Sequence, residues 1–209
     1  MFTPKGEKWV QSLTREVKFR KIKKEIRIVG IDDCPFVSRS FGKADVIGAV
    51  LRGGHSLDGI VHTNVDIDGF DATEKISEMI TLSPHHHQLR IIMLDGITFA
   101  GFNIVDIARL FELTGIPVIA LTRAKTDMDN VRNALKNLPN WGERWLMIQR
   151  AGPILKLRIG ETELQTHVAG VSNEDAEKVI RISSTRGNIP EPLRVAHLIA
   201  SGLGEQNDQ

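Results

Sequence analysis

Three short runs of Ile, Val and Leu in the first third of the chain predict strands. Glu25–Asp32 is almost entirely apolar and ends at a carboxylate, which is typical of a strand covered on both faces. Val46–Arg52 and Gly59–Asp66 follow it, joined by a short connection that begins Gly53-Gly54. Because so short a connection joins antiparallel strands, we expect these two to form a hairpin. The beginning of the chain therefore predicts an antiparallel three-strand meander.

From Asp71 onwards the hydrophobic period becomes helical. Asp71-Ala72-Thr73-Glu74 resembles a capping box, with Asp71 as the N-cap and Glu74 as its partner. The remaining predicted elements are, in order, strand Arg90–Leu94, a helix within Ile104–Leu113, strand Ile116–Thr122, a helix over Met128–Leu138, a hairpin within Ile154–Val168, and helices over Asn173–Ser183 and Leu193–Leu203. Together they predict an α/β fold whose mixed sheet, a meander followed by parallel strands, is flanked by helices.

The composition is that of one globular domain spanning residues 1–209. Hydrophobic residues make up 41% and charged residues 25% of the chain, both close to globular averages. No apolar run approaches the ~20 residues that span a bilayer, so we expect no membrane segment. The N-terminus has no apolar stretch typical of a secretory signal, and the single Cys suits a reducing compartment. We expect a cytoplasmic protein with a flexible tail at Gly204–Gln209.

Positive charge is unevenly distributed, although the net charge is only +1. One basic cluster precedes the first strand and includes Lys23 and Lys24, and another near the C-terminus includes Arg186 and Arg194. Such clusters can contact the phosphates of nucleic acid. A solvated face beside a strand is the commoner explanation of either cluster taken alone. These four side chains are the candidate nucleic-acid contacts.

Two aspartates follow predicted strands that we expect to lie side by side. If Glu25–Asp32 is parallel to Arg90–Leu94, then Asp32 and Asp95 meet at the carboxyl edge of the sheet, where open α/β sheets place their sites. Neighbouring strands are about 4.8 Å apart, so both carboxylates could bind one Mg²⁺ or Mn²⁺ ion. The sequence therefore predicts a divalent-metal site at this edge.

A third metal ligand has two candidates, Glu74 and Asp71, at the start of the predicted helix. Carboxylates around a divalent ion activate water for phosphodiester hydrolysis. The same residues have simpler explanations, since Asp71 and Glu74 suit a helix cap and Asp32 or Asp95 alone suits a turn. The signal therefore comes from the set and not from any single residue.

A competing interpretation is a receiver-like domain, in which an aspartate accepts a phosphoryl group. Asp32-Asp33, Asp95 and Thr122 resemble its acidic pocket and its threonine. Such a domain has a helix between its first two strands, whereas Val46–Asp66 is predicted to be a hairpin, and no strand ending in a suitable lysine follows Thr122. The expected topology therefore favours the metal site.

Three segments carry a resemblance to a known family. They are Ile28–Phe36 (IVGIDDCPF), Asp68–Thr73 (DGFDAT) and Leu94–Phe102 (LDGITFAGF), and with the C-terminal segment they span nearly the whole chain. They resemble the endonuclease V-like family of uncharacterised, largely archaeal proteins (domain of unknown function ninety-nine). That family is similar to endonuclease V, a Mg²⁺-dependent nuclease that cuts near deaminated adenine in DNA or RNA. The resemblance implies a ribonuclease H-like fold and nucleic acid as partner.

The resemblance to endonuclease V also implies roles for single residues. Asp32 and Asp95 match its two metal aspartates. Glu74 is the nearest acid to its metal glutamate, and Asp71 is the rival. Arg123 ends a strand that resembles the one that delivers its catalytic lysine, so Arg123 is expected near the scissile phosphate.

The sequence departs from endonuclease V where that enzyme recognises its substrate. Asp66 stands in the place of a strand-separating tyrosine, and the chain contains no Tyr. Gly101 and Gly170-Val171 stand where two of its histidines are expected. Arg123 cannot act as a neutral lysine, because a guanidinium stays charged. These differences put hypoxanthine recognition in doubt.

Two functional hypotheses remain. The first is a nuclease or phosphodiesterase that depends on Mg²⁺ or Mn²⁺, with Asp32, Asp95 and Glu74 or Asp71 as ligands. The second is a nucleic-acid-binding or scaffold protein that retains the fold without the chemistry. The sequence leaves open the choice among DNA, RNA and a small nucleotide, and the oligomeric state.

Overall fold

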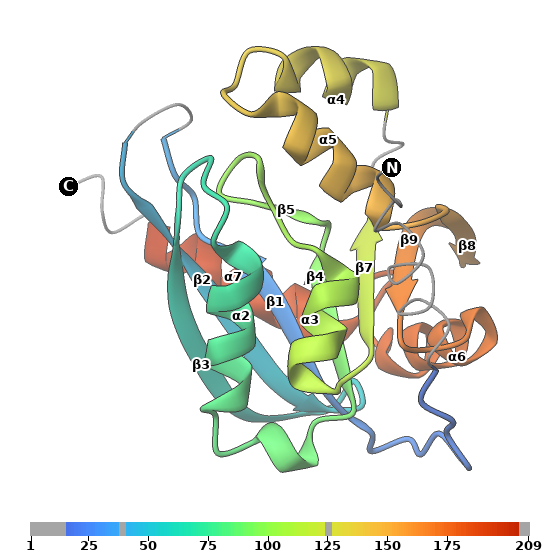
Figure 1. Ribbon diagram of the computed structural model, residues 1–209. Coiled ribbons are helices and arrows are strands. Elements are labelled where there is room, and N and C mark those ends of the chain that lie inside the picture. The colour runs from blue at the N-terminus through green and yellow to red at the C-terminus, as the bar shows by residue number, and fades with distance from the viewer. Residues whose placement is uncertain (1–15, 38–40, 124–126, 205–209) are drawn as a thin grey trace, which may run out of the picture.

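A seven-stranded mixed sheet runs through the computed structural model, which describes residues 16–37, 41–123 and 127–204 (Figure 1). The strand order is β3-β2-β1-β4-β7-β9-β8. The strands are β1 (Arg27–Asp33), β2 (Lys43–Arg52), β3 (Ser56–Asp66), β4 (Ile91–Asp95), β7 (Val118–Thr122), β8 (Leu155–Ile159) and β9 (Thr162–Ala169). The small hairpin of β5 (Thr98–Phe99) and β6 (Asn103–Ile104) stands apart from this sheet.

The pairing of the strands confirms the predicted meander followed by parallel strands. β1, β2 and β3 are antiparallel to one another, whereas β1, β4 and β7 are parallel. The C-terminal hairpin β8–β9 adds to the far side, with β9 antiparallel to β7. The carboxyl ends of β1, β4 and β7 therefore share one edge of the sheet, and their starts share the opposite edge. No receiver-like domain has this arrangement, because β1 and β2 are antiparallel neighbours without a helix between them.

Helices cover both faces of the sheet. α2 (Ala72–Thr81) and α3 (Ile107–Thr114) pack on one face, whereas α6 (Asn173–Ser183) and α7 (Glu191–Gly204) pack on the other (Figure 1). β1 serves both cores because its side chains alternate. Val29 and Ile31 join the core under α2 and α3, and Ile28 joins the core under α6 and α7.

Two further helices lie beyond the carboxyl edge of the sheet. They are α4 (Met128–Leu135) and α5 (Trp141–Arg150), at the top of Figure 1. The sequence predicted α4 three residues too long and did not predict α5 or the β5–β6 hairpin. The short helix η1 (His86–Gln88) lies at the opposite edge, before β4.

Two helices end in local caps, whereas the capping box predicted for a third helix is absent. The Ser172 hydroxyl accepts a hydrogen bond from the Asp175 amide and caps α6, and Gly115 ends α3 in the left-handed conformation (φ 68°). The predicted capping box at α2 is wrong. Asp71 occupies the N-cap position, but its side chain makes no cap hydrogen bond. Its carboxylate accepts instead from the Asp66 amide and from Asn103 Nδ2.

Two predictions concern the ends of the chain. The tail predicted at Gly204–Gln209 lies outside the described residues except for Gly204, which ends α7. The segment inspected for a secretory signal also lies outside them up to residue 15. Among the helices that the structure describes, none is long and apolar enough to cross a membrane.

Candidate metal centre

Asp32 and Asp95 lie side by side, as the strand ends predicted. In the parallel register of β1 and β4, Ile31 is the partner of Leu94, so the two aspartates follow at equivalent positions. His197 of α7 joins them. One ligand atom from each of the three side chains lies within 4.8 Å of the other two. We call Asp32, Asp95 and His197 the acidic cluster. Their proximity is observed, and their role as metal ligands remains a prediction.

His197 reaches the acidic cluster because α7 packs very closely on β1. Asp32 lies two residues beyond Gly30 and therefore points to the same face of the sheet, toward α7. A Cβ atom on Gly30 would lie 2.2 Å from the carbonyl carbon of Pro192, so only glycine permits this approach. His197 Nδ1 is consequently 2.7 Å from Asp32 Oδ2. His197 was not predicted as a site residue, since no local spacing in the sequence links a C-terminal helix to the end of the first strand.

Both aspartates at the end of β1 have raised pKa values. Burial, chiefly, and the charge of Asp95 raise the pKa of Asp32 from 3.8 to about 6, while the contact with His197 opposes this rise. Burial also raises the pKa of Asp33. Asp33 faces away from α7, and its Oδ2 accepts a 2.7 Å hydrogen bond from the Ala100 amide. A cation bound between Asp32 and Asp95 would relieve the repulsion between them.

Arg123 lies at the same edge, at the end of β7. Its Nη2 atom is 3.4 Å from Asp95 Oδ2, and half of its side chain is exposed. An exposed ion pair of this length contributes little to stability. The guanidinium therefore remains able to turn toward a ligand that approaches the acidic cluster.

The two candidates for a third carboxylate do not join the acidic cluster. Asp71 is held by the Asp66 amide and by Asn103 Nδ2 at 2.6 Å. Glu74 lines a separate hollow with Asp106 and Arg109. The physical reason is that α2 packs on the face of the sheet opposite α7. Within the described part of the chain, the third member of the group is an imidazole from the other face.

Three of the four candidate nucleic-acid contacts lie apart from the acidic cluster, and the fourth, Arg194, is on α7 three residues before His197. Lys23 and Lys24 precede β1, so they lie at the edge where β1 begins. Arg186 follows Thr185, whose hydroxyl donates to the Gly54 carbonyl at that same edge. Arg194 forms an ion pair with the buried Glu191 at 2.7 Å. The charge of Arg194 is thus largely occupied within α7.

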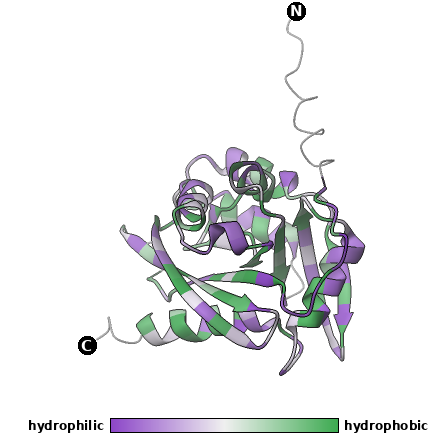
Figure 2. Cartoon of the chain, turned by 90° about the horizontal axis from the view of Figure 1, so that it is seen from below, coloured by the Kyte–Doolittle hydropathy of each residue, from purple (hydrophilic) through white to green (hydrophobic). Residues whose placement is uncertain are grey.

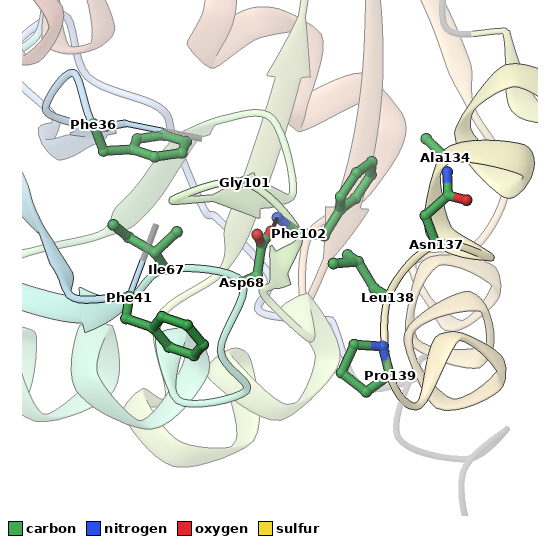
Figure 3. A pocket seen from close by; sticks show the side chains of 10 residues that line it. All are labelled: Phe36, Phe41, Ile67, Asp68, Gly101, Phe102, Ala134, Asn137, Leu138 and Pro139. Atoms are coloured by element: carbon green, nitrogen blue, oxygen red, sulfur yellow. Dashed lines mark hydrogen bonds between the residues drawn. The ribbon is translucent and has the colours of Figure 1, made fainter. Parts of the chain in front are cut away.

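An open pocket of about 1120 Å³ lies at the carboxyl edge of the sheet, although none of the three residues of the acidic cluster lines it (Figure 3). Phe36 lies three residues beyond the end of β1, and Gly101 follows Ala100, whose amide donates to Asp33, so both walls of the pocket connect to the carboxyl end of β1. Figure 3 shows Phe36 and Phe41 on one side, Phe102 on the other and Asp68 between them. The Phe41 side chain is fully exposed. One exposed ring and two partly buried rings beside a carboxylate suit a flat, polar-edged ligand such as a nucleobase.

Arg144 of α5 fixes the walls of this pocket. Its side chain is only 2% exposed, and its guanidinium donates to the main-chain carbonyls of Asp68, Gly69 and Phe102. It also lies 4.0 Å from the centre of the Phe70 ring. Burial lowers the pKa of Arg144, and the charge of Asp68 opposes the effect. One buried cation therefore joins the β3–α2 loop to the β5–β6 hairpin.

Comparison with known proteins places the chain in a family. A sequence model of the family described as endonuclease dU matches residues 24–204. The chain belongs to the endonuclease dU family. A protein of the UPF0215 group from Methanothermobacter thermautotrophicus is 53% identical over 190 residues, covering 90% of this chain and 93% of the relative. The archaeal, endonuclease V-like resemblance predicted from the sequence is thereby confirmed.

Solved structures of endonuclease dU relatives and of endonuclease V share the fold. A crystal structure of a protein of unknown function from Archaeoglobus fulgidus is 42% identical, has a TM-score of 0.76 and covers 85% of this chain and 98% of that one. Endonuclease V from Ciona intestinalis, crystallised with a DNA that contains inosine, is 14% identical with a TM-score of 0.65 and covers 96% of this chain and 94% of that one. The chain therefore has the ribonuclease H-like fold predicted for it.

Proposed function

We propose that this protein is an endonuclease that hydrolyses phosphodiester bonds in nucleic acid with the help of a divalent metal ion. The observation that carries the proposal is the acidic cluster at the carboxyl edge of the sheet. The fold adds support, because the similar structures include nucleases, one of them crystallised with DNA. A fold alone does not confer activity, so the proposal rests on the side chains of the acidic cluster.

The donor set of the acidic cluster fits a divalent ion. Carboxylate oxygens suit Mg²⁺ and Mn²⁺, and an imidazole favours Mn²⁺ over Mg²⁺. Asp32, Asp95 and His197 supply two carboxylates and one imidazole, with ligand atoms close enough to one another to share an ion. Burial, chiefly, and the charge of Asp95 raise the pKa of Asp32, and a divalent ion would lower it again. A divalent ion bound there would make water more acidic and neutralise charge on the phosphate.

The chain's own residues would hold and orient the reacting groups. Asp32 and Asp95 bind the ion, and the contact with Asp32 holds the His197 ring in place. Asp33 fixes the neighbouring loop through the Ala100 amide. Arg123, next to Asp95, is positioned to contact the scissile phosphate and to offset the charge that develops on it.

The pocket at the carboxyl edge of the sheet is the proposed binding place for the nucleobase that the enzyme recognises in its substrate. Phe36, Phe41 and Phe102 can stack on a base that has left its helix, and Asp68 can accept a hydrogen bond from a ring N–H group. The family description, endonuclease dU, makes a strand containing deoxyuridine the first substrate to test. A strand containing inosine is the second, because it is the ligand named for the Ciona structure.

Cleavage and metal binding test the proposal together. Mn²⁺ is titrated calorimetrically into the wild type, Asp95→Asn and the exposed control Asp129→Asn, which lies on α4. The same proteins are incubated with oligonucleotides that contain deoxyuridine, inosine or neither. We expect Mn²⁺ binding and cleavage in the wild type and the control, and neither in Asp95→Asn. Wild-type protein that binds no Mn²⁺, with and without oligonucleotide, would refute the proposal.

A second candidate function is a nucleic-acid-binding protein without catalysis. Arg123 favours it, since the resemblance to endonuclease V implies a lysine there and a guanidinium cannot exchange protons as an amine does. Under this hypothesis Asp95→Asn leaves nucleic-acid affinity unchanged and the wild type cleaves no oligonucleotide. The same experiment therefore separates the two functions.

A further inference from the structure

Four chain segments converge at the edge of the sheet opposite the acidic cluster. The segment before β1 enters beside β9, where the Val17 amide donates to the Gly170 carbonyl, and then runs along the edge to Ile26. The Gly53 amide of the β2–β3 turn donates to the Ile26 carbonyl at 2.7 Å. The residue before β4, Arg90, donates its amide to the Arg27 carbonyl. The loop after α6 joins them through the hydrogen bond between Thr185 and Gly54.

These segments bring many cations together. Seven exposed basic side chains form what we call the basic edge: Lys18, Arg20, Lys21, Lys23, Lys24, Arg90 and Arg186. No ion pair joins any of the seven to a described residue, whereas Arg27 and Arg52 of the same region share Asp58. Only Glu16, Glu25 and Asp58 provide negative charge on the described part of these segments. In a chain whose net charge is +1, this is a strong local excess.

The exposed surface of the basic edge is polar as well as charged. The apolar residues of the segment before β1, Phe19 and Ile22, turn inward and pack against the core under α6 and α7. In Figure 2, which looks up at this edge, the segment that continues from the grey N-terminal trace is largely purple. Protein interfaces depend on exposed aromatic and apolar anchors, whereas binding to a phosphate backbone requires cations.

We propose that the basic edge binds the phosphate backbone of nucleic acid at a place separate from the acidic cluster. β1 spans the sheet between the two edges with seven residues, so they are about 20 Å apart. This distance corresponds to about six nucleotides of a duplex strand. One short oligonucleotide therefore cannot occupy both edges, whereas a longer strand can. The binding stands independently of catalysis; only its effect on cleavage rests on the proposed function.

The test compares two triple variants that each remove three positive charges. The first is Lys23→Gln, Lys24→Gln and Arg186→Gln on the basic edge. The control is Lys136→Gln, Lys156→Gln and Lys178→Gln, which are exposed cations elsewhere. Affinity for a DNA duplex of about 30 base pairs, longer than the distance between the edges, is measured by fluorescence anisotropy with EDTA present, over a range of salt concentrations. Melting curves establish that both variants fold, and Arg186→Gln alone replaces a triple variant that does not.

We expect the basic-edge variant to bind the duplex at least about tenfold more weakly than the control at low salt. The slope of log affinity against log salt should fall in magnitude by about 2 to 3, since each phosphate contact contributes about 0.9. Polyglutamate is the probe for an acidic protein partner. Equal DNA affinity for both variants, or tighter binding of polyglutamate than of DNA, would overturn the proposal.

Cleavage assays then test whether binding at the basic edge assists hydrolysis at the acidic cluster. If the proposed function is correct, the basic-edge variant loses at least about fivefold in kcat/KM on the long duplex substrate and keeps its rate on a substrate of about three nucleotides, which is too short to reach both edges. An equal loss on both lengths would overturn a separate binding edge. Absence of cleavage by every protein, including the wild type, would refute the proposed function and leave the binding result to decide the basic edge.

Discussion

Replacing Asp32 by asparagine should stabilise the metal-free protein while abolishing metal binding. The Asp32 side chain is 8% exposed, so its charge is poorly hydrated. Asparagine has the same shape, and its oxygen can still accept the hydrogen bond that Asp32 Oδ1 receives from the Asp33 amide. The substitution therefore removes the charge and leaves the packing in place.

The magnitude follows from the pKa of Asp32. Its value rises from 3.8 to about 6 in the folded protein, and one pKa unit corresponds to about 1.4 kcal/mol. The folded state thus holds the proton more tightly than the unfolded state. The charge of Asp32 costs nothing below about pH 4, increasingly destabilises the fold between about pH 4 and 6, and has its full effect above about pH 6. The whole shift corresponds to about 3 kcal/mol, and because solvent partly screens the charge, we expect a net gain of about 2 kcal/mol at about pH 7.5.

Urea unfolding and thermal melting in EDTA, at about pH 4 and about pH 7.5, measure this effect. The melting temperature at the higher pH should rise by about 4 to 8 °C, given about 2 to 4 °C per kcal/mol for a chain of this length. At the lower pH the two proteins should be nearly equal. With Mn²⁺ present the order at the higher pH should reverse, because only the wild type gains stability from the ion. An Asp32→Asn variant that is less stable than the wild type in EDTA at the higher pH would refute the assignment of strain to Asp32.

Three further predictions concern the same edge of the sheet. Mn²⁺ affinity measured by calorimetry should fall about tenfold per pH unit below about pH 6, as Asp32 takes up a proton; an affinity that is flat from about pH 7 to 5 would contradict this. Gly30→Ala should cost about 2 to 3 kcal/mol in urea unfolding and weaken Mn²⁺ binding, because the new methyl group displaces α7 and its His197; unchanged Mn²⁺ affinity would show that His197 is not held in this way. Arg144→Met should cost about 3 to 5 kcal/mol, since three buried carbonyls lose their donor; a loss below about 1 kcal/mol would mean that water replaces the guanidinium.

The sheet was predictable because its strands carry their signals locally. The apolar run before Asp32 and the short Gly53-Gly54 connection specify a buried strand and a hairpin without reference to the rest of the chain. α5 was missed because its sequence, with Trp141 and Gly142 in the first turn, has weak helical periodicity. What holds α5 in place is the tertiary contact of Arg144 with loops 42 and 75 residues earlier in the chain. Such a contact leaves no periodic trace in a sequence.

Part of the candidate site could likewise be predicted from the sequence, and part of it could not. Asp32 and Asp95 could be paired from the sequence, because parallel neighbours bring their carboxyl ends together whatever their side chains are. Glu74 and Asp71 were the two candidates for the third ligand, yet neither joins the pair, because α2 packs on the opposite face of the sheet from α7. His197 has no such local signal. Its position depends on the close contact between Gly30 and Pro192, which only the folded structure shows.

The acidic cluster is formed partly by the pairing of parallel strands and partly by the packing of α7 on the sheet. These two contributions act in opposite directions on the charge of Asp32. The sheet alone would bring two carboxylates together at a partly buried edge, which raises the pKa of Asp32 and favours its protonation. α7 adds an imidazole 2.7 Å from Asp32, which favours the charged carboxylate but does not offset burial and the charge of Asp95. The arrangement is therefore destabilising in the absence of a cation and becomes favourable when one is bound. Groups whose pKa is shifted in this way are enriched at functional sites, in agreement with the proposed metal site.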